Sequence, residues 1–287
     1  MKINVKAKIA AVFMAALTAA GAAAAMPASA TYNNSIMIQG DAFDPGCQNY
    51  LIYCARYKFR AGKYWNGGNP DSYTSTPCNG HTNDNHFIQH NIYSAGYTSY
   101  IGAVNGSQCY GFAAKLAYDF YGKADAWIRF SNPTNFQFRV GDIVRINNQH
   151  SVFITEVNGS SLKIADCNAG GTCIIRWNVA ASYTNNKFYL GGTAYNVSFV
   201  ERPILAGDVN GDSQITWEDV DIISQIFRGI YDFSGKPQRV INVMKEAADL
   251  DNDGQISFND VYIAYYQFDH SGIYRQQRFL TNVGNWS

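Results

Sequence analysis

The sequence predicts an α+β protein built from two modules, and three observations predict it. An amphipathic helix pattern over residues 105–122 is followed by strand patterns over residues 140–146, 151–157 and 162–168. An acidic C-terminal block repeats one oxygen-rich loop, and a helical pattern follows each copy. The chain has 287 residues, and at roughly 150 residues per domain this length suggests two domains.

The composition argues against a disordered chain and against a broad basic surface. Charged residues make up 15% of the chain and aromatic residues another 15%, so there is ample apolar surface to bury. Lysines and arginines number 22, and aspartates and glutamates also number 22. Because the net charge is zero, we expect no nucleic-acid partner.

The first 30 residues predict a secretory signal peptide. Lys2, Lys6 and Lys8 precede an apolar run over residues 9–25, and residues 28–30 form an Ala-x-Ala cleavage site. An N-terminal membrane anchor is the alternative, but the Ala-rich run and its cleavage site disfavour it. No later segment reaches 18 uninterrupted apolar residues. We therefore expect a secreted, extracellular mature chain without a transmembrane segment.

Residues 31–105 are rich in Tyr, Asn, Gly and Ser, and we expect irregular structure and short strands there. Export permits disulfides. Cys47 and Cys54, and likewise Cys167 and Cys173, are close enough in sequence to close small loops. If Cys109 is a free thiol, at least one other cysteine is also unpaired, and the connectivity stays open. The six cysteines are Cys47, Cys54, Cys78, Cys109, Cys167 and Cys173.

The central helix pattern places a cysteine in its first turn. Phe112, Leu116 and Phe120 recur at i, i+4 and i+8, and Ser107 suits the N-cap position. Cys109 then lies where the helix dipole and the free backbone amides favour the thiolate, which is the reactive form. A buried structural cysteine is the alternative.

His150 opens the middle strand pattern, and the Asn158-Gly159 pair predicts a hairpin to the next strand. With a two-residue loop, His150 opposes Cys167. With a three-residue loop, it opposes Asn168 and has Asp166 diagonally on the same face. We prefer the second register because it gives the histidine an acid or amide that orients it. A simple surface histidine is the alternative.

A cysteine, a histidine and an orienting acid or amide form the nucleophile, base and orienter of covalent acyl transfer. Their order resembles the CHAP family of papain-like cysteine amidohydrolases and peptidases, many of which are cell-wall hydrolases. The resemblance covers residues 100–200. It lies in Gln108-Cys109 at a helix start, in residues 140–144 before the histidine, and in Asp166-Cys167-Asn168 after it.

This resemblance implies a papain-like core in which an N-terminal helix packs on an antiparallel sheet. It also implies that Cys109 is the nucleophile, that His150 is the base, and that Asp166 is the third member, with Asn168 as its rival or as a fourth member. Gln108 would lie beside the oxyanion, with the Cys109 backbone amide as a donor. The family usually has Glu where Asp166 stands.

The C-terminal block contains 12 acidic and 6 basic residues over residues 207–287, and its repeat predicts calcium binding. Twelve-residue loops beginning 41 residues apart offer oxygens at positions 1, 3, 5, 7, 9 and 12, which suits the six to eight oxygen ligands of Ca²⁺. Position 7 contributes its backbone carbonyl. The alternative is two solvated acidic turns. The principal candidate ligands are Asp208, Asn210, Asp212, Gln214 and Asp219 in the first loop and Asp249, Asp251, Asp253, Gln255 and Asp260 in the second.

Two units of loop and exit helix, without the entering helix of an EF-hand, resemble a dockerin. Dockerins are non-catalytic modules that attach enzymes to cohesin modules of cellulosome scaffoldins. The resemblance covers residues 207–287 and implies a small all-α module with two structural calcium ions and a cohesin partner. This sequence departs from the pattern in its longer spacer, in Ser213 where Gly is usual, and in the bulky Trp217 and Phe258 at position 10.

The sequence therefore predicts a signal peptide over residues 1–30, a CHAP-like cysteine hydrolase domain over 31–203 and a dockerin over 204–287. The expected function is an exported cysteine-dependent amide hydrolase, a peptidoglycan amidase or endopeptidase, held on a cell-surface or cellulosomal scaffold. Two alternatives remain: a papain-like protease acting on proteins, and a non-catalytic component that binds cell wall or glycan. A glycosidase is not favoured, because no carboxylate pair stands out in residues 31–206.

Overall fold

A computed structural model describes residues 45–65, 73–74, 86–106, 108–121, 124–271 and 280. The chain divides into two units, Met1–Asn33 and Asn34–Ser287, and the first lies outside the described residues. The predicted signal peptide therefore cannot be compared with the structure. In the described part of the chain, no helix is both long and apolar enough to cross a membrane. We call residues 31–203 the central domain and residues 204–287 the C-terminal domain.

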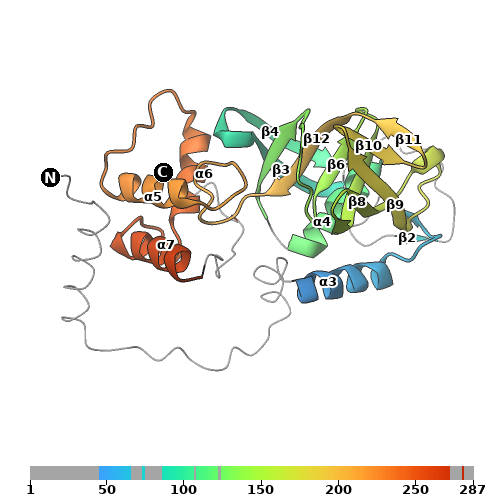
Figure 1. Cartoon of the computed structure of the whole chain (residues 1–287), viewed down its shortest axis with the longest axis horizontal. Coiled ribbons are helices and arrows are strands. Elements are labelled where there is room, and N and C mark those ends of the chain that lie inside the picture. The colour runs from blue at the N-terminus through green and yellow to red at the C-terminus, as the bar shows by residue number, and fades with distance from the viewer. Residues whose placement is uncertain are drawn as a thin grey trace. The chain divides into compact units, whose positions relative to one another are not determined.

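The protein is mixed α/β, with one large sheet and five α-helices among its described residues (Figure 1). The first elements are α3 (Pro45–Lys58), β1 (Tyr64–Trp65), β2 (Tyr73–Thr74), β3 (His86–Ser94), the 3₁₀ helix η1 (Ala95–Tyr97), β4 (Tyr100–Gly106), α4 (Gln108–Tyr121) and β5 (Ala126–Ser131). Next come β6 (Ile143–Ile146), β7 (His150–Asn158), β8 (Ser161–Asp166), η2 (Ala169–Gly171), β9 (Arg176–Thr184), β10 (Lys187–Leu190), β11 (Thr193–Tyr195) and β12 (Val197–Pro203). The last are α5 (Trp217–Phe227), α6 (Gln238–Ala248) and α7 (Phe258–Ser271).

Ten strands form the large sheet, in the order β11-β10-β9-β8-β7-β6-β12-β5-β3-β4. Every neighbouring pair is antiparallel except β3 and β5, which run parallel. The predicted antiparallel sheet is therefore found around β6, β7 and β8, but the sheet as a whole is mixed. The parallel pair is possible because α4 lies between β4 and β5 in the chain and supplies the long crossover that such a pair needs.

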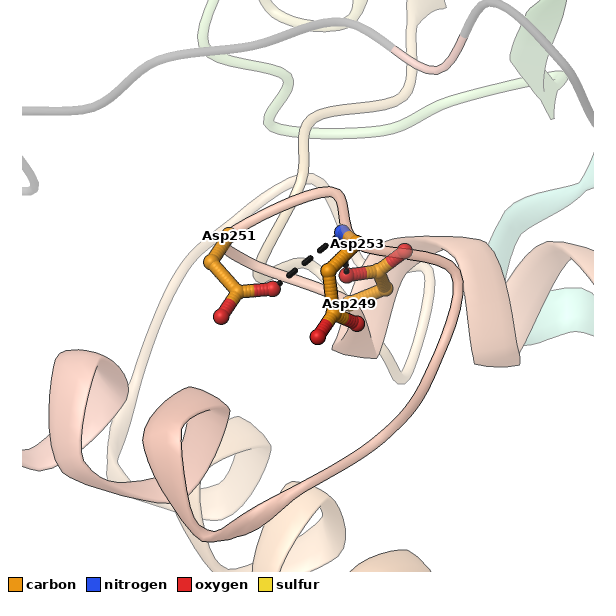
Figure 2. A group of neighbouring side chains, drawn as sticks. All are labelled: Asp249, Asp251 and Asp253. Carbon is orange, nitrogen blue, oxygen red and sulfur yellow. Dashed lines mark hydrogen bonds between the residues drawn. The ribbon is translucent and has the colours of Figure 1, made fainter.

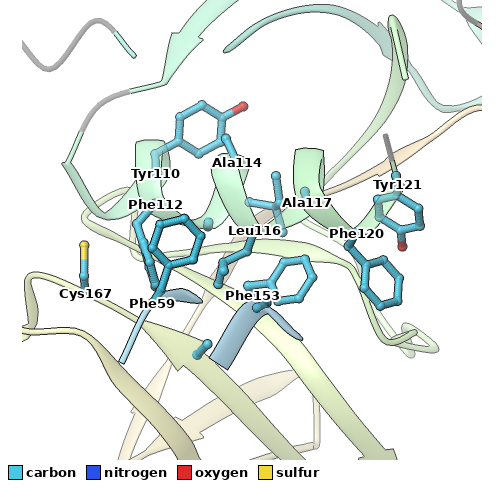
Figure 3. Close-up of a cluster of buried hydrophobic side chains, with 14 of the residues drawn as sticks. Phe59, Tyr110, Phe112, Ala114, Leu116, Ala117, Phe120, Tyr121, Phe153 and Cys167 are labelled. Atoms are coloured by element: carbon cyan, nitrogen blue, oxygen red, sulfur yellow. The ribbon is translucent and has the colours of Figure 1, made fainter. Parts of the chain in front are cut away.

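Helix α4 packs on the sheet through the apolar face that the sequence predicts (Figure 3). Phe112, Leu116 and Phe120 are almost fully buried, and the Phe120 ring centroid lies 5.8 Å from that of Phe153 on β7. Phe59, just after α3, meets Phe112 edge-on, also at 5.8 Å. Burying each such side chain contributes about 1.5–3 kcal/mol, so this layer holds the start of α4 firmly against the sheet.

Helix α3 was not predicted, because irregular structure was expected before residue 105. Its inner face carries Leu51, Ile52 and Ala55, which pack against the same cluster as α4. Its outer face carries exposed Tyr50 and Tyr53. The large apolar side chains of the helix are split between its two faces, with Leu51 and Ile52 packed inward and the tyrosines exposed, so no single apolar stripe marks the helical period.

The strand predicted over residues 140–146 begins only at Ile143. Gly141 has a φ of 98°, and a Cβ atom there would lie 1.9 Å from the Tyr121 hydroxyl oxygen. The buried Asp142 carboxylate accepts a hydrogen bond from the Arg139 backbone amide at 2.8 Å and closes a turn. The first residues of the predicted strand therefore form a tight turn against the end of α4.

The C-terminal domain is helical over its described residues, as predicted, and shares an apolar core with the central domain. Thr216 caps α5 by accepting a hydrogen bond from the Glu218 amide, and Asp219 completes a capping box. The Ile204 amide donates to the Ala126 carbonyl on β5 at 3.0 Å. Buried members of the shared core include Tyr93, Tyr97, Ala126 and Ile128 from the central domain and Ile204, Val209, Val220, Ile223, Val243 and Met244 from the C-terminal domain.

Candidate functional site

Cys109 is the second residue of α4 and is only 5% exposed. Gln108, which begins the helix, has a left-handed φ of 46°, so the chain turns sharply into the helix at the cysteine. The predicted N-cap, Ser107, lies outside the described residues. The thiol thus lies in the first turn of the helix, where the helix dipole favours a negative charge.

His150 begins β7 and pairs with Ile146 of β6. Its Nε2 atom lies 2.8 Å from Oδ2 of Asp166, at the end of β8. The imidazole also neighbours the Cys109 thiol: burial raises the pKa of the thiol, but His150 lowers it. The structure therefore brings together the thiol, the imidazole and the carboxylate in the order that the sequence predicts.

The His150 register depends on a β-bulge rather than on the three-residue loop that we preferred. Asn158 pairs with Ser161, so both predicted loop registers are wrong at the turn. The register then shifts between Ile154 and Glu156. Beyond this bulge the pairing continues as the preferred register requires, and Asp166 reaches His150. The extra residue on β7 thus restores the contact between His150 and Asp166, which the register at the turn alone would have lost.

Arg176 is a site residue that sequence reasoning missed. It lies opposite Asp166 in the β8–β9 pair and donates through Nε to Oδ1 at 2.8 Å and through Nη2 to Oδ2 at 2.5 Å. The Asp166 side chain is fully buried, so the guanidinium and His150 together compensate its charge. The β8–β9 register shifts between Ile164 and Asp166, so a regular extension of the hairpin pattern would not have placed Arg176 opposite Asp166.

No hydrogen bond joins Asn168 to His150. Its Nδ2 atom donates to the Gln108 Oε1 atom at 3.1 Å. Its own Oδ1 atom is buried and has no hydrogen-bond partner. Asn168 therefore helps to place Gln108 beside the thiol, and the orienting contact to the imidazole belongs to Asp166.

Arg145 also lies at the thiol and was not predicted. Its Nη1 atom is 3.6 Å from the Cys109 Sγ atom and 3.0 Å from the Ser151 hydroxyl oxygen. Its Nη2 atom donates to the Asn148 carbonyl at 2.8 Å. These contacts fix a positive charge beside the thiol, where it stabilises a thiolate.

The charges of the site shift three pKa values together. Burial raises the pKa of the Cys109 thiol, but the hydrogen bond and charge of His150, a backbone amide and Arg145 lower it below its usual value. Burial lowers the pKa of His150, yet Asp166 and Cys109 raise it to about 9. Burial also opposes the charge of Asp166, but His150 and Arg176 hold its pKa below the usual range. The arrangement therefore favours a thiolate–imidazolium pair.

The other described cysteines have different environments. Cys54 is exposed, whereas Cys167 and Cys173 are fully buried. Burial, followed by a hydrogen bond with Cys173, raises the pKa of Cys167 well above its usual value. Cys78 and the Cys47 side chain lie outside the described residues.

The two oxygen-rich loops share the hydrogen bonds of their position-12 carboxylates. The position-12 carboxylates of Asp219 and Asp260 are fully buried. Oδ1 of Asp219 accepts from the Val209 amide at 2.9 Å, and Oδ1 of Asp260 accepts from the Leu250 amide at 2.7 Å. In each loop the other oxygen accepts from the backbone amide of position 9. Each loop is therefore closed onto the start of its exit helix in the same way.

The second loop fits a hard divalent cation. One oxygen each from Asp249, Asp251 and Asp253 lies within 4.8 Å of the others (Figure 2). Three carboxylates held so close repel one another unless a cation lies between them. An oxygen-only set of this kind suits Ca²⁺.

In the first loop, burial together with repulsion from Asp219 and Asp212 raises the pKa of Asp208 well above its usual value. A cation bound between these carboxylates would remove this penalty, so the first loop fits the same ion. Gln214 and Gln255 stand at position 7 of their loops, where the backbone carbonyl is the predicted ligand.

Comparison with known proteins identifies the C-terminal domain. No curated protein matches the chain. Residues 206–263 match the family of the dockerin type I domain, and this range contains both loops. Dockerins generally bind calcium, and the match supports attachment to a cohesin-bearing scaffold and association with an extracellular cellulosome. The C-terminal domain therefore contains a dockerin type I domain.

Proposed function

We propose that the protein is an exported cysteine-dependent amide hydrolase that its dockerin holds on a cohesin-bearing scaffold. The observation that supports hydrolysis most directly is the contact series from Cys109 through His150 to Asp166. A papain-like core is part of the proposal, because a helix carrying the nucleophile packs on the strands that carry the base. Two structural calcium ions, one in each loop, would hold the dockerin in its binding conformation.

In the first half of the reaction, the Cys109 thiolate attacks the carbonyl carbon of the scissile amide and forms a C–S bond. The carbonyl oxygen takes the electron pair, and the Cys109 backbone amide with the Gln108 side chain is positioned to stabilise it. The tetrahedral intermediate then collapses. The C–N bond breaks, His150 gives its proton to the leaving amine, and a thioester remains.

In the second half, His150 takes a proton from water, and the hydroxide adds to the thioester carbonyl. The C–S bond breaks, the acid product leaves, and the thiolate–imidazolium pair forms again. Asp166 keeps the imidazole in the tautomer with Nδ1 towards the sulfur. Arg176 keeps Asp166 ionised, so it is a positioning residue that acts through the carboxylate.

The proposed substrates are peptidoglycan amides, either stem-peptide bonds or cross-bridges, with protein peptide bonds as the alternative. The test is incubation of the full chain with purified peptidoglycan and with casein, followed by measurement of newly released amines. We expect release from peptidoglycan, and Cys109→Ala should abolish it by several orders of magnitude. The matched control is Cys54→Ala, which removes an exposed thiol and should change nothing. Activity of Cys109→Ala within tenfold of the wild type would refute the proposal.

A non-catalytic role in binding cell wall or glycan is the second candidate, and α3 gives it an observation of its own. Tyr50, Tyr53 and Tyr57 lie on one face of the helix and are all more than half exposed. Aromatic faces in such a row can stack on sugar rings. This candidate predicts that pulldown by peptidoglycan falls when the three tyrosines become serine, while no amine is released by any variant.

A further inference from the structure

The two calcium loops differ at two positions where their backbones agree. At position 4 the first loop has Gly211 with a φ of 75°, and the second has Asn252 with a φ of 61°. At position 6 the first loop has Ser213 with a φ of 67°, and the second has Gly254 with a φ of 85°. Because all four residues are left-handed, the loop conformation does not explain why the side chains differ.

Contact with the central domain explains Gly211. A Cβ atom on this residue would lie 2.6 Å from two ring carbons of Tyr97, which is only 2% exposed. The Gly96 amide donates to the Gly211 carbonyl at 2.8 Å. The Tyr97 hydroxyl donates to the carbonyl of Asp208, the first ligand position, at 3.0 Å. Any side chain at position 4 would separate η1 from the loop.

Ser213 is explained by two arginines of the central domain. Its hydroxyl oxygen accepts from Nη1 of Arg202 at 3.1 Å and from Nη1 of Arg139 at 3.3 Å. Arg202 is buried and is held by the Asp142 carboxylate through bonds of 2.7 and 2.9 Å. At Gly254, by contrast, a Cβ atom would meet nothing within 4 Å. The serine therefore completes a polar contact that the second loop does not make.

We propose that Tyr97, Arg139 and Arg202 form a docking surface for the first calcium loop of this same chain. The surface holds loop positions 1, 4 and 6, and the shared apolar core continues beneath it. An ion that orders the loop therefore also orders η1 and the adjoining strands of the central domain. The first loop is thus a structural part of the central domain as well as half of the dockerin. The inference goes beyond the proposed function and does not depend on hydrolysis.

The test is hydrogen exchange on the full chain, in saturating calcium and in excess chelator. We expect calcium to slow exchange of the amides in residues 93–100 at least tenfold in the wild-type protein. Gly211→Asn introduces a residue that the second loop tolerates in the same conformation, but that collides with Tyr97. This variant should lose the calcium-dependent slowing in residues 93–100 and still bind the wild-type number of calcium ions by calorimetry.

The reciprocal changes in the second loop, Asn252→Gly and Gly254→Ser, are the matched controls and should keep the slowing. Ser213→Gly is a milder variant for the case that Gly211→Asn fails to fold, and it should reduce the slowing in the same segment. The proposal is overturned if chelation leaves the amide exchange rates of residues 93–100 unchanged in the wild type. It is equally overturned if the first-loop variants lose no more protection than their second-loop controls.

Discussion

Asp166 is the residue on which the geometry of the candidate site depends most, because His150 and Arg176 both bind it. Asp166→Asn keeps the shape and removes the charge, so the pKa of His150 should fall from about 9 towards its usual 6.5 or so. Hydrolysis should fall by about 100-fold or more, as when the orienting acid of a catalytic triad is replaced. Titration of the imidazole by NMR measures the first effect independently of any substrate.

Asn168→Ala is the matched comparison, because the Asn168 side chain hydrogen-bonds Gln108 and not the imidazole. It should leave the pKa of His150 near 9 and lower the rate less than Asp166→Asn does. If Asn168→Ala shifts the imidazole titration more than Asp166→Asn, the orienting role has been assigned to the wrong side chain.

The lowered pKa of Cys109 predicts the pH dependence of its alkylation. In the wild type, iodoacetamide should react rapidly well below pH 8.5 or so, the usual pKa of a thiol. In His150→Ala the imidazole no longer compensates the burial of the thiol, so the pKa rises and reaction at pH 6 slows by about tenfold or more. Mass spectrometry of the labelled peptide against pH measures both profiles. Identical profiles in the two proteins would disprove the ion pair.

The raised pKa of His150 also makes the stability of the fold depend on pH. The folded-state pKa of His150, about 9, lies above its unfolded value of about 6.5. Its contribution to stability is therefore fully present below about pH 6.5 and is lost as the pH rises through about 9. Chemical denaturation at pH 6 and pH 9.5 should accordingly differ less in His150→Ala than in the wild type.

At the scale of elements, the contact between α4 and the turn before β6 can be tested at Gly141. Gly141→Ala combines a strained left-handed φ with a collision against the buried Tyr121 ring. Gly159→Ala has the same kind of strain, with a φ of 58°, but nothing lies within 4 Å of its Cβ position. We expect Gly141→Ala to lower the free energy of unfolding by about 1–3 kcal/mol more than Gly159→Ala does. Equal losses in denaturant titrations would mean that the Tyr121 contact contributes nothing.

Local sequence patterns predicted the helix and strands that carry the site. They did not predict the strand pairings between residues far apart in the chain. The i, i+4, i+8 spacing of Phe112, Leu116 and Phe120 identified α4, and β-strand alternation identified β7 and β8. The pairing of β12 between β5 and β6, and the parallel β3–β5 pair, join residues far apart in the chain. No short-range period encodes such a pairing.

The residues of the candidate site also differ in whether a local sequence pattern predicts them. Cys109 and His150 follow from local signals, a helix start and a strand start. That Asp166 and Asn168 share a face with His150 depends on a bulge that no sequence pattern marks. Arg176 and Arg145 reach the site across strand pairs, so only the sheet register reveals them.

At the scale of the whole molecule, the sequence suggested two separate modules, and the structure joins them through one apolar core. Arg239 of α6 adds a polar contact by donating to the Tyr100 hydroxyl oxygen at 2.9 Å. A dockerin fixed in this way would present the proposed hydrolase to the scaffold in one orientation. Trp217 and Phe258, the exposed position-10 residues of the two repeats, remain accessible to a partner.

The two calcium loops should bind the ion with different affinities. The second loop has four carboxylates, Asp249, Asp251, Asp253 and Asp260, whereas the first has three, Asp208, Asp212 and Asp219, with Asn210 at position 3. The first loop also lies against two guanidinium groups, which bond Ser213 at 3.1 and 3.3 Å. Fewer negative oxygens and nearby positive charge both weaken the attraction for a cation. The second loop should therefore be the tighter site.

Calorimetry on the full chain separates the sites, because Asp249→Ala should remove the tighter binding step and Asp208→Ala the weaker one. Asp221→Ala, on the solvent side of α5, is a control that removes an acid outside both loops. If Asp208→Ala removes the tighter step instead, the docked first loop is preorganised by the central domain strongly enough to outweigh its charge deficit. The ranking by charge would then be wrong.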